Sequence, residues 1–374
     1  MTSPRPVIII VMLLCACHPK NVSEHHKEKE NNTLLRYARG FRIAHNDSCT
    51  QITVLNDWQN GQPTSAHYYL CNSTALNNTL SVKVPAKKVI CLSTSHIQMI
   101  EALHEHKSII GVSNPMLVNS PETCRRIKNR LIQDVGSEAN LDYETIISLQ
   151  PDVVIGYGIE GENLGYITKL RQLGIPVIMN AEYLEPHPLG KAEWIIFFAM
   201  LFNKKDEATQ IFDSIASRYN TLVKKVGQTK RKPGIITGLP FKSKWWVPGG
   251  KSYLAKMIED AGGNYLWKDN PSSGSFTVSF EELLSRSSEA DIWINCGDAH
   301  SMDEILNSDS RLNLLKAYKT AQVYNNNARV NSHGGNDFWE SGILYPDRIL
   351  ADLIAIFHAE YLPGHTLYYY KKLQ

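Results

Sequence analysis

The feature that most constrains the fold is a stretch of sequence that occurs twice. Residues 143–158 read YETIISLQPDVVIGYG, and residues 280–297 read FEELLSRSSEADIWINCG. Both contain Glu-x-aliphatic-aliphatic-Ser, a short turn, and an Asp that opens an apolar run. Short apolar runs are typical of strands buried on both faces, which belong to parallel sheets covered by helices. The repeat therefore predicts two similar α/β halves.

Alternating strand and helix patterns begin at Lys87, with KVICLS followed by TSHIQMIEALHEH, and restart after Pro233. Between the halves, residues 191–226 contain neither Gly nor Pro. A continuous helix of that length would span roughly 50 Å, although an interruption is expected at 203–206. The predicted fold is α/β: two Rossmann-like lobes joined by a long helix, with a small N-terminal β appendage.

The N-terminal stretch VIIIVMLLCACHPKN has an apolar run too short for a spanning helix and is typical of a secretory signal. The tetrapeptide LCAC resembles the lipobox of bacterial lipoproteins, which implies acylation of Cys17. The alternative is an ordinary signal peptide whose cysteines are incidental. The polar segment that follows predicts a tether, and Cys49 and Cys71 lie in neighbouring predicted strands where they could pair.

These observations define an expected organisation. It comprises a lipoprotein signal peptide (1–16), a flexible tether (17–36), a β appendage (37–85), an N-terminal α/β lobe (86–190), a helical bridge (191–230) and a C-terminal α/β lobe (231–374).

Charge and motifs exclude several classes of function. The formal net charge is only +2, which argues against a nucleic-acid surface. The cysteines beyond the signal lack CxxC spacing, which argues against a zinc site or a disulfide scaffold. GGKS at 249–252 lacks the first glycine of a phosphate loop, because Trp245 stands there. HGGND at 333–337 is similar to a lipase oxyanion hole, but the chain contains no G-x-S-x-G motif. An enzyme is therefore not expected.

Aromatic residues follow predicted strands in both halves, where open α/β sheets bind ligands. They are Tyr157, Trp245, Trp246, Phe338 and Trp339. Any one of them could be a core residue. Together they favour a flat or bulky apolar ligand, because each ring offers a large contact area.

From about Ala86 to Ala359 the chain resembles the class III periplasmic binding proteins of ABC importers. That family captures ferric siderophores, haem and cobalamin. The resemblance rests on KVICLSTSHIQMIEAL, SIIGVS, LQPDVVIGYG, LRQLGIPVI, VPGGKSYLAKMIEDAGGNYLWKD, VSFEELLSRSSEADIWI and DFWESGILYPDRILADLIAIFH. It implies two α/β lobes that hold a ligand between them, joined by a long helix.

The resemblance also implies partners. Family members present one acidic residue on each lobe to arginines of a permease dimer. The matching residue on the C-terminal lobe is Glu281, and on the N-terminal lobe it is Glu162 or Glu160. Ordinary surface charge is the alternative for each. The implied protein is a monomer without a catalytic cofactor, lipid-anchored in the periplasm, with the inner membrane favoured.

The ligand itself is left open. Members that bind catecholate siderophores line the cleft with several arginines, whereas this chain offers Lys242, Lys244 and, less clearly, Arg329. Ser95 and His96 lie at the first loop of the N-terminal lobe. His96 could ligate haem, or it could face solvent at the start of a helix. The alternative functions are a bare-metal binder for zinc or manganese and, disfavoured by the missing G-x-S-x-G motif, an α/β hydrolase.

Overall fold

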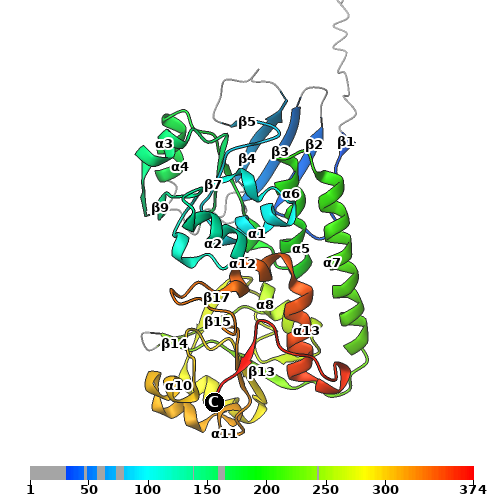
Figure 1. Cartoon of the computed structure of the whole chain (residues 1–374). Helices are drawn as coiled ribbons and strands as arrows, with labels where there is room; N and C mark the ends of the chain where they lie inside the picture. The colour runs from blue at the N-terminus through cyan, green and yellow to red at the C-terminus, as the bar shows by residue number, and fades with distance from the viewer. Residues whose placement is uncertain are drawn as a thin grey trace, which may run out of the picture.

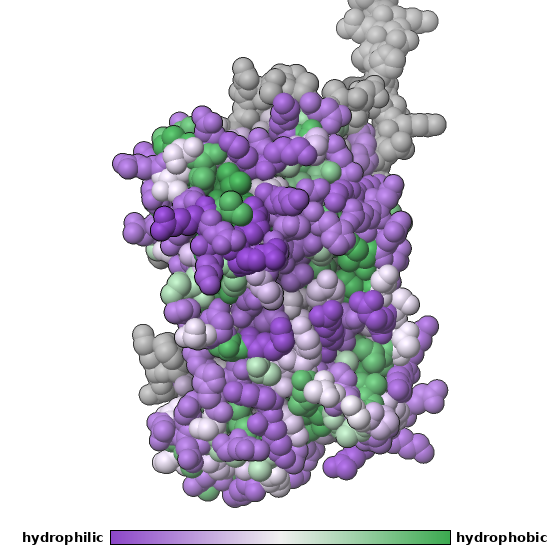
Figure 2. Space-filling view, viewed as in Figure 1, coloured by the Kyte–Doolittle hydropathy of each residue, from purple (hydrophilic) through white to green (hydrophobic). Residues whose placement is uncertain are grey.

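The computed structural model describes residues 31–45, 49–56, 64–72, 80–137, 139–158, 165–241 and 244–374. Two α/β lobes are stacked, and the helix α7 (Lys205–Val226) runs along the side of both (Figure 1). The predicted fold class is therefore confirmed. In the described part of the chain, no helix combines the length and the apolar character needed to cross a membrane. On the face shown in Figure 2, hydrophobic residues form small patches within a mostly hydrophilic surface.

The N-terminal lobe is built on a parallel sheet with strand order β12-β11-β6-β7-β8. Its strands are short and, apart from the edge strand β8, largely buried, as expected for a sheet with helices on both faces. The elements of this lobe are β6 (Val89–Cys91), α1 (Thr94–Ala102), β7 (Ile109–Val112), α2 (Pro121–Lys128), β8 (Gln133–Asp134), β9 (Gly136–Ser137), β10 (Asn140–Leu141), α3 (Tyr143–Leu149), β11 (Val153–Gly156), α4 (Gly165–Gln172) and β12 (Val177–Met179).

The C-terminal lobe repeats this plan with strand order β16-β13-β18-β19-β20, in which β20 is antiparallel. A second sheet, β14-β15-β17, projects from it. The elements are β13 (Gly234–Thr237), β14 (Pro240–Phe241), β15 (Lys244–Pro248), α8 (Tyr253–Asp260), β16 (Asn264–Tyr265), β17 (Ser275–Val278), α9 (Phe280–Ser285), β18 (Ile292–Ile294), α10 (Met302–Ser308), α11 (Lys316–Lys319), β19 (Val323–Asn325), α12 (Asp337–Leu344), α13 (Pro346–Phe357) and β20 (Lys371–Lys372).

The sequence repeat has a structural reason. In each lobe a helix, α3 or α9, leads into a strand, β11 or β18, that pairs in parallel with the first strand of its lobe. The Asp at the start of that strand caps the neighbouring strand. Asp152 accepts hydrogen bonds from the N–H groups of Lys87 (2.7 Å) and Lys88 (2.9 Å), and Asp291 accepts one from Gly234 (2.9 Å).

The bridge between the lobes is helical but broken. It consists of α5 (Pro188–Glu193), α6 (Ile195–Met200) and α7, with a turn over 201–203 close to the predicted interruption. Trp194, Phe197 and Phe198 are fully buried. This apolar centre packs against both the N-terminal lobe and the β appendage.

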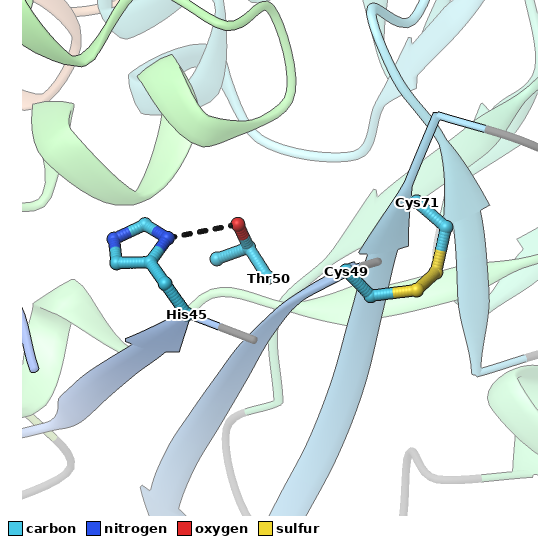
Figure 3. The surroundings of a disulfide bond; sticks show 4 residues. All are labelled: His45, Cys49, Thr50 and Cys71. Atoms are coloured by element: carbon cyan, nitrogen blue, oxygen red, sulfur yellow. Dashed lines mark hydrogen bonds between the residues drawn. A yellow bond between two sulfur atoms is a disulfide. The ribbon is translucent and has the colours of Figure 1, made fainter. Parts of the chain in front are cut away.

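The β appendage is a sheet of order β1-β2-β3-β4-β5, formed by β1 (Asn31–Asn32), β2 (Phe41–His45), β3 (Cys49–Asn56), β4 (Thr64–Cys71) and β5 (Ser81–Lys83). Its inward face packs on the bridge: the ring of Phe41 lies 4.6 Å from that of Trp194. Cys49 and Cys71 lie opposite each other on β3 and β4 and form a disulfide (Figure 3). The suggested pairing of these cysteines is therefore confirmed.

Two buried glutamates fix the segment that leads into this sheet. Glu193 accepts hydrogen bonds from the N–H groups of residues 36, 37 and 38 at 2.7–2.8 Å, and Glu185 accepts them from residues 39 and 40. The predicted tether extended to residue 36. The structure instead already has strand β1 at residues 31–32 and anchors residue 36, so ordered chain begins before the predicted boundary.

Candidate functional site

The two lobes meet through helices α1 and α12, which lie side by side at the centre of the molecule (Figure 1). Glu340 on α12 is 1 % exposed and reaches into the N-terminal lobe. Its carboxylate accepts hydrogen bonds from the N–H groups of Asn119 and Ser120, each at 2.7 Å. Because Ser120 caps α2, Glu340 ties the C-terminal lobe to the start of a helix in the other lobe.

The HGGND loop before α12 makes a second connection. The side-chain amide of Asn331 donates to the carbonyls of Met116 (3.0 Å) and Val118 (3.1 Å) in the N-terminal lobe. A Cβ at Gly335 would lie only 2.1 Å from the carbonyl oxygen of Leu117, so the close approach requires glycine. The resemblance of HGGND to an oxyanion hole therefore has another explanation: the loop is a contact between lobes.

Burial makes Glu340 unusually basic. Desolvation raises its pKa to about 7, although the two backbone N–H groups favour the ionised form. Nearby Glu101 and Asp337 raise the pKa further by repulsion. Glu101 is itself held by the hydroxyls of Ser120 and Thr123, at 2.5 and 2.6 Å. The junction thus contains a carboxyl group that titrates near neutral pH.

A second buried polar group lies where the bridge meets both lobes. Ser95 on α1 donates to Glu182, at 2.8 Å, and Glu182 is 5 % exposed. The ammonium of Lys191 on α5 lies 4.4 Å from the ring centroid of Tyr253 on α8. Burial raises the pKa of Glu182 and lowers that of Lys191, and the opposite charges partly counter both shifts.

This group was not among the residues predicted from sequence, apart from Ser95. A signal was present: Lys191 stands directly before AEWIIFFAMLF, so a charge adjoins one of the most apolar stretches of the chain. A charged side chain buried at such a place needs a partner. Here an aromatic face and a carboxylate fill that role.

His96 does not face solvent, contrary to one of the two readings of its position. It is fully buried, between the rings of Tyr157 (6.2 Å) and Phe198 (5.7 Å). Desolvation lowers the pKa of His96 to about 3, so the ring is neutral at physiological pH. Tyr157 is partly buried, and its carbonyl accepts a hydrogen bond from Tyr166 (2.6 Å). His96 thus forms part of the core under the first loop.

The predicted aromatic residues separate into buried and exposed members. On β15, Trp245 points inward: it is 2 % exposed, donates to the carbonyl of Thr237 and packs on Trp293. Trp246 points outward and is 48 % exposed. On α12, Phe338 is 1 % exposed and Trp339 is 51 % exposed. Trp245 and Phe338 therefore offer no free face to a ligand in this structure.

The charged residues predicted to contact the ligand differ in whether they already have a partner in the structure. Lys244 is exposed at the start of β15, whereas Arg329 is bound to Asp337 at 2.6 Å and lies over the ring of Tyr368. Lys242 lies outside the described residues. Arg329 is therefore already engaged by an acidic partner.

The expected docking and lipidation residues can be placed only in part. Glu281 is exposed in the first turn of α9, while its neighbour Glu282 accepts a hydrogen bond from Trp267. Glu160, Glu162 and Cys17 lie outside the described residues. Among those described, no three His, Cys, Asp or Glu side chains are grouped as metal ligands would be, which gives a bare-metal site no support there.

A sequence model of the family described as periplasmic binding protein matches residues 89–330. The chain belongs to this family. The match covers most of the N-terminal lobe, the bridge and the C-terminal lobe as far as β19, whereas the β appendage lies before it and α12, α13 and β20 lie after it. The family consists of binding proteins, which agrees with the expectation that this chain is not an enzyme.

Solved structures share the fold of this periplasmic binding protein. A possible iron-binding solute-binding protein of Staphylococcus epidermidis aligns with a TM-score of 0.59 at 18 % identity, over 73 % of this chain and 99 % of that one. A haem-binding protein of Roseiflexus sp. RS-1 gives 0.57 at 17 %, over 74 % and 99 %. The vitamin B12 binding protein of Vibrio cholerae gives 0.52 at 16 %, over 74 % and 98 %.

The curated relatives include an uncharacterized lipoprotein of Methanocaldococcus jannaschii. It is 28 % identical over 306 residues, which is 79 % of this chain and 71 % of the relative. The aligned length exceeds the 242 residues matched by the family model, 89–330. Similarity to this lipoprotein therefore extends beyond residues 89–330.

Proposed function

We propose that this periplasmic binding protein is the lipid-anchored receptor of an ABC importer and that its cargo is a metal chelate. The cargo would be a ferric siderophore, haem or cobalamin. The main support is the two-lobed fold, which resembles structures whose names specify iron, haem and vitamin B12 binding. A receptor of this kind binds its cargo and releases it unchanged to the permease. No bond in the cargo is made or broken, so no catalytic residue is required.

The proposed cargo contacts are the two exposed indoles, Trp246 on β15 and Trp339 on α12. An indole that is about half exposed has a large apolar face available to a ligand. Both belong to the C-terminal lobe, on β15 and α12, and α12 packs against the N-terminal lobe. Tyr157 after β11, Ser95 at the start of α1, Lys244 on β15 and Lys242, which precedes β15 in the sequence, would complete the site.

Docking and anchoring complete the proposal. Glu281 and either Glu162 or Glu160 would meet arginines of the permease dimer, because carboxylate–guanidinium pairs fix orientation well. Acylated Cys17 would hold the protein at the membrane, with the inner membrane favoured. A Cys17→Ser variant should then appear in the soluble periplasmic fraction, and continued membrane retention would contradict the anchor.

Binding can be tested on the purified Cys17→Ser protein. Each chelate is added separately and the complex is measured by native mass spectrometry and visible absorption. The expected result is a one-to-one complex with one chelate class. The visible spectrum identifies the bound chelate, because corrin, haem and ferric-siderophore spectra differ. A complex with zinc or manganese alone would favour the bare-metal alternative, and binding of none of these ligands would refute the proposed cargo.

The contact residues have a separate test. Replacing Trp246 and Trp339 by Ala should weaken cargo binding at least tenfold, which corresponds to about 1.4 kcal/mol. Leu314→Ala is a suitable control, because Leu314 is also exposed (44 %) but lies in the helical turn Ser310–Leu314. Equal affinity of the double variant and the wild type would remove the indoles from the site.

A further inference from the structure

A cavity of about 560 Å³ lies between the N-terminal segment and the edge of the C-terminal lobe. One wall consists of residues 36–39 and 186–187, and the other of α8, the GGKS loop before it and the edge strand β16. None of the predicted cargo residues that the structure describes lines it. Its volume falls in the range of small-molecule sites.

The lining is strongly cationic. It has the basic residues Arg36, Arg39, Lys232, Lys251, Lys256 and Lys268 and the acidic residues Glu259 and Asp269. Six positive and two negative charges give the lining of the cavity a net charge of +4, whereas the entire chain carries only +2. Positive charge is therefore concentrated here rather than spread over the surface.

Part of this charge is already neutralised. Arg36 pairs with Asp213, and Lys256 pairs with Asp260 (2.6 Å) and Glu259 (3.2 Å). By contrast, no carboxylate among the described residues forms an ion pair with the other basic residues of the wall, which are Arg39, Lys232, Lys251 and Lys268. These four residues line the same cavity, and the ammonium of Lys268 donates a hydrogen bond to the side-chain oxygen of Asn264 (2.9 Å).

The backbone around two of these cations is fixed. The N–H of Arg39 is held by the buried carboxylate of Glu185 (2.9 Å). Lys251 follows Gly249 and Gly250, where a Cβ would lie 2.1 Å from a neighbouring carbonyl oxygen in each case. The two glycines of GGKS thus allow the tight packing that positions Lys251. Lys251 can therefore contribute to an anion site even though GGKS is not a phosphate loop.

The positive charges of the lining also affect His187, which lies in the cavity wall. Burial lowers the pKa of His187, and the charges of Lys256 and Arg39 lower it further, against the opposing effect of Asp260. The lowered pKa disfavours the charged form of His187, so the positive charge of the cavity comes from its Arg and Lys side chains, and Nδ1 of His187 accepts the N–H of Leu189 (3.1 Å).

We propose that this cavity binds a small phosphate-bearing anion, held by Arg39 from the N-terminal segment and by Lys251 from the C-terminal lobe. Guanidinium and ammonium groups suit phosphate oxygens, and two walls from different parts of the chain allow several oxygens to be bound at once. The bound anion would link the β appendage side of the molecule to the C-terminal lobe.

Inorganic pyrophosphate is the probe, titrated calorimetrically into the full-length Cys17→Ser protein. We expect saturable one-to-one binding that weakens when salt is raised from about 50 mM to about 500 mM, because screening acts on exposed charges. Arg39→Gln combined with Lys251→Gln should lower the affinity at least tenfold. Lys128→Gln, on the exposed face of α2, is the control and should leave it unchanged.

Lipid vesicles then show whether the phosphate group belongs to a lipid headgroup or to a soluble anion. Association with phosphatidylglycerol vesicles, absent with phosphatidylcholine and competed by pyrophosphate, would identify a lipid headgroup. Pyrophosphate binding without vesicle association would identify a soluble anion. Lack of saturable binding, or equal affinity of the double variant and wild type, would overturn the site. Cargo binding should be unaffected by the double variant, so this result is independent of the proposed function.

Discussion

Glu340→Gln tests the charge that joins the lobes. The carboxyl group has a pKa of about 7 in the folded protein, against an ordinary value of 4.5. At 1.36 kcal/mol per unit, this difference corresponds to about 3 kcal/mol. Below an ordinary carboxyl pKa the group is protonated in both states. Between the two pKa values the carboxyl group is ionised in the unfolded state but still protonated in the folded state, so the free energy of unfolding falls as pH rises, and this contribution is lost once the pH exceeds the folded pKa.

The free energy of unfolding of the wild type should therefore fall, relative to Glu340→Gln, by about 3 kcal/mol between pH about 4 and pH about 8. Urea unfolding of both proteins across this range measures the difference directly. Titrating groups that lie away from Glu340 are common to both proteins and largely cancel. Glu282→Gln, at an exposed position, should show no such divergence from the wild type. Parallel pH profiles of wild type and Glu340→Gln would refute the raised pKa.

Further predictions concern docking and the β appendage. Glu281→Ala should reduce uptake while leaving cargo affinity intact, whereas Glu282→Ala should not affect uptake; a loss of affinity in Glu281→Ala would refute docking. Glu193→Ala removes the acceptor of three backbone N–H groups and should lower the free energy of unfolding by roughly 3 kcal/mol or more, seen as a lower Tm. Replacing Cys49 and Cys71, 22 positions apart, by Ser should cost about 3 kcal/mol in urea unfolding, and an unchanged midpoint would contradict this.

The two-lobed fold could be predicted because it depends on patterns that are local in sequence. The repeated helix, turn and Asp-led strand occupies matching places in the two sheets, and each Asp caps an adjacent strand. The break in the bridge was also visible, because polar residues follow a strongly apolar helix. Each of these features is determined by residues close together in the chain.

The orientation of single aromatic rings was not predicted, and the reason is geometric. Trp245 and Trp246 were expected together after a predicted strand, but they lie on strand β15 itself, where successive side chains point to opposite faces. Only Trp246 is therefore exposed. Phe338 and Trp339 differ similarly on α12, because neighbouring residues of a helix face different directions. A strand or helix assignment at these positions would have separated the pairs.

Buried carboxylates that bind backbone N–H groups could not be inferred from sequence, yet they determine how the parts are joined. Glu193 and Glu185 hold the segment before the appendage, Glu340 holds the start of α2, and Asp352 on α13 accepts the N–H groups of residues 368–370. Each joins segments distant in sequence, and a buried carboxylate without such donors would be costly. The appendage is thereby tied to the bridge that both lobes share, so the N-terminal segment can form one wall of the cationic cavity while the C-terminal lobe forms the other.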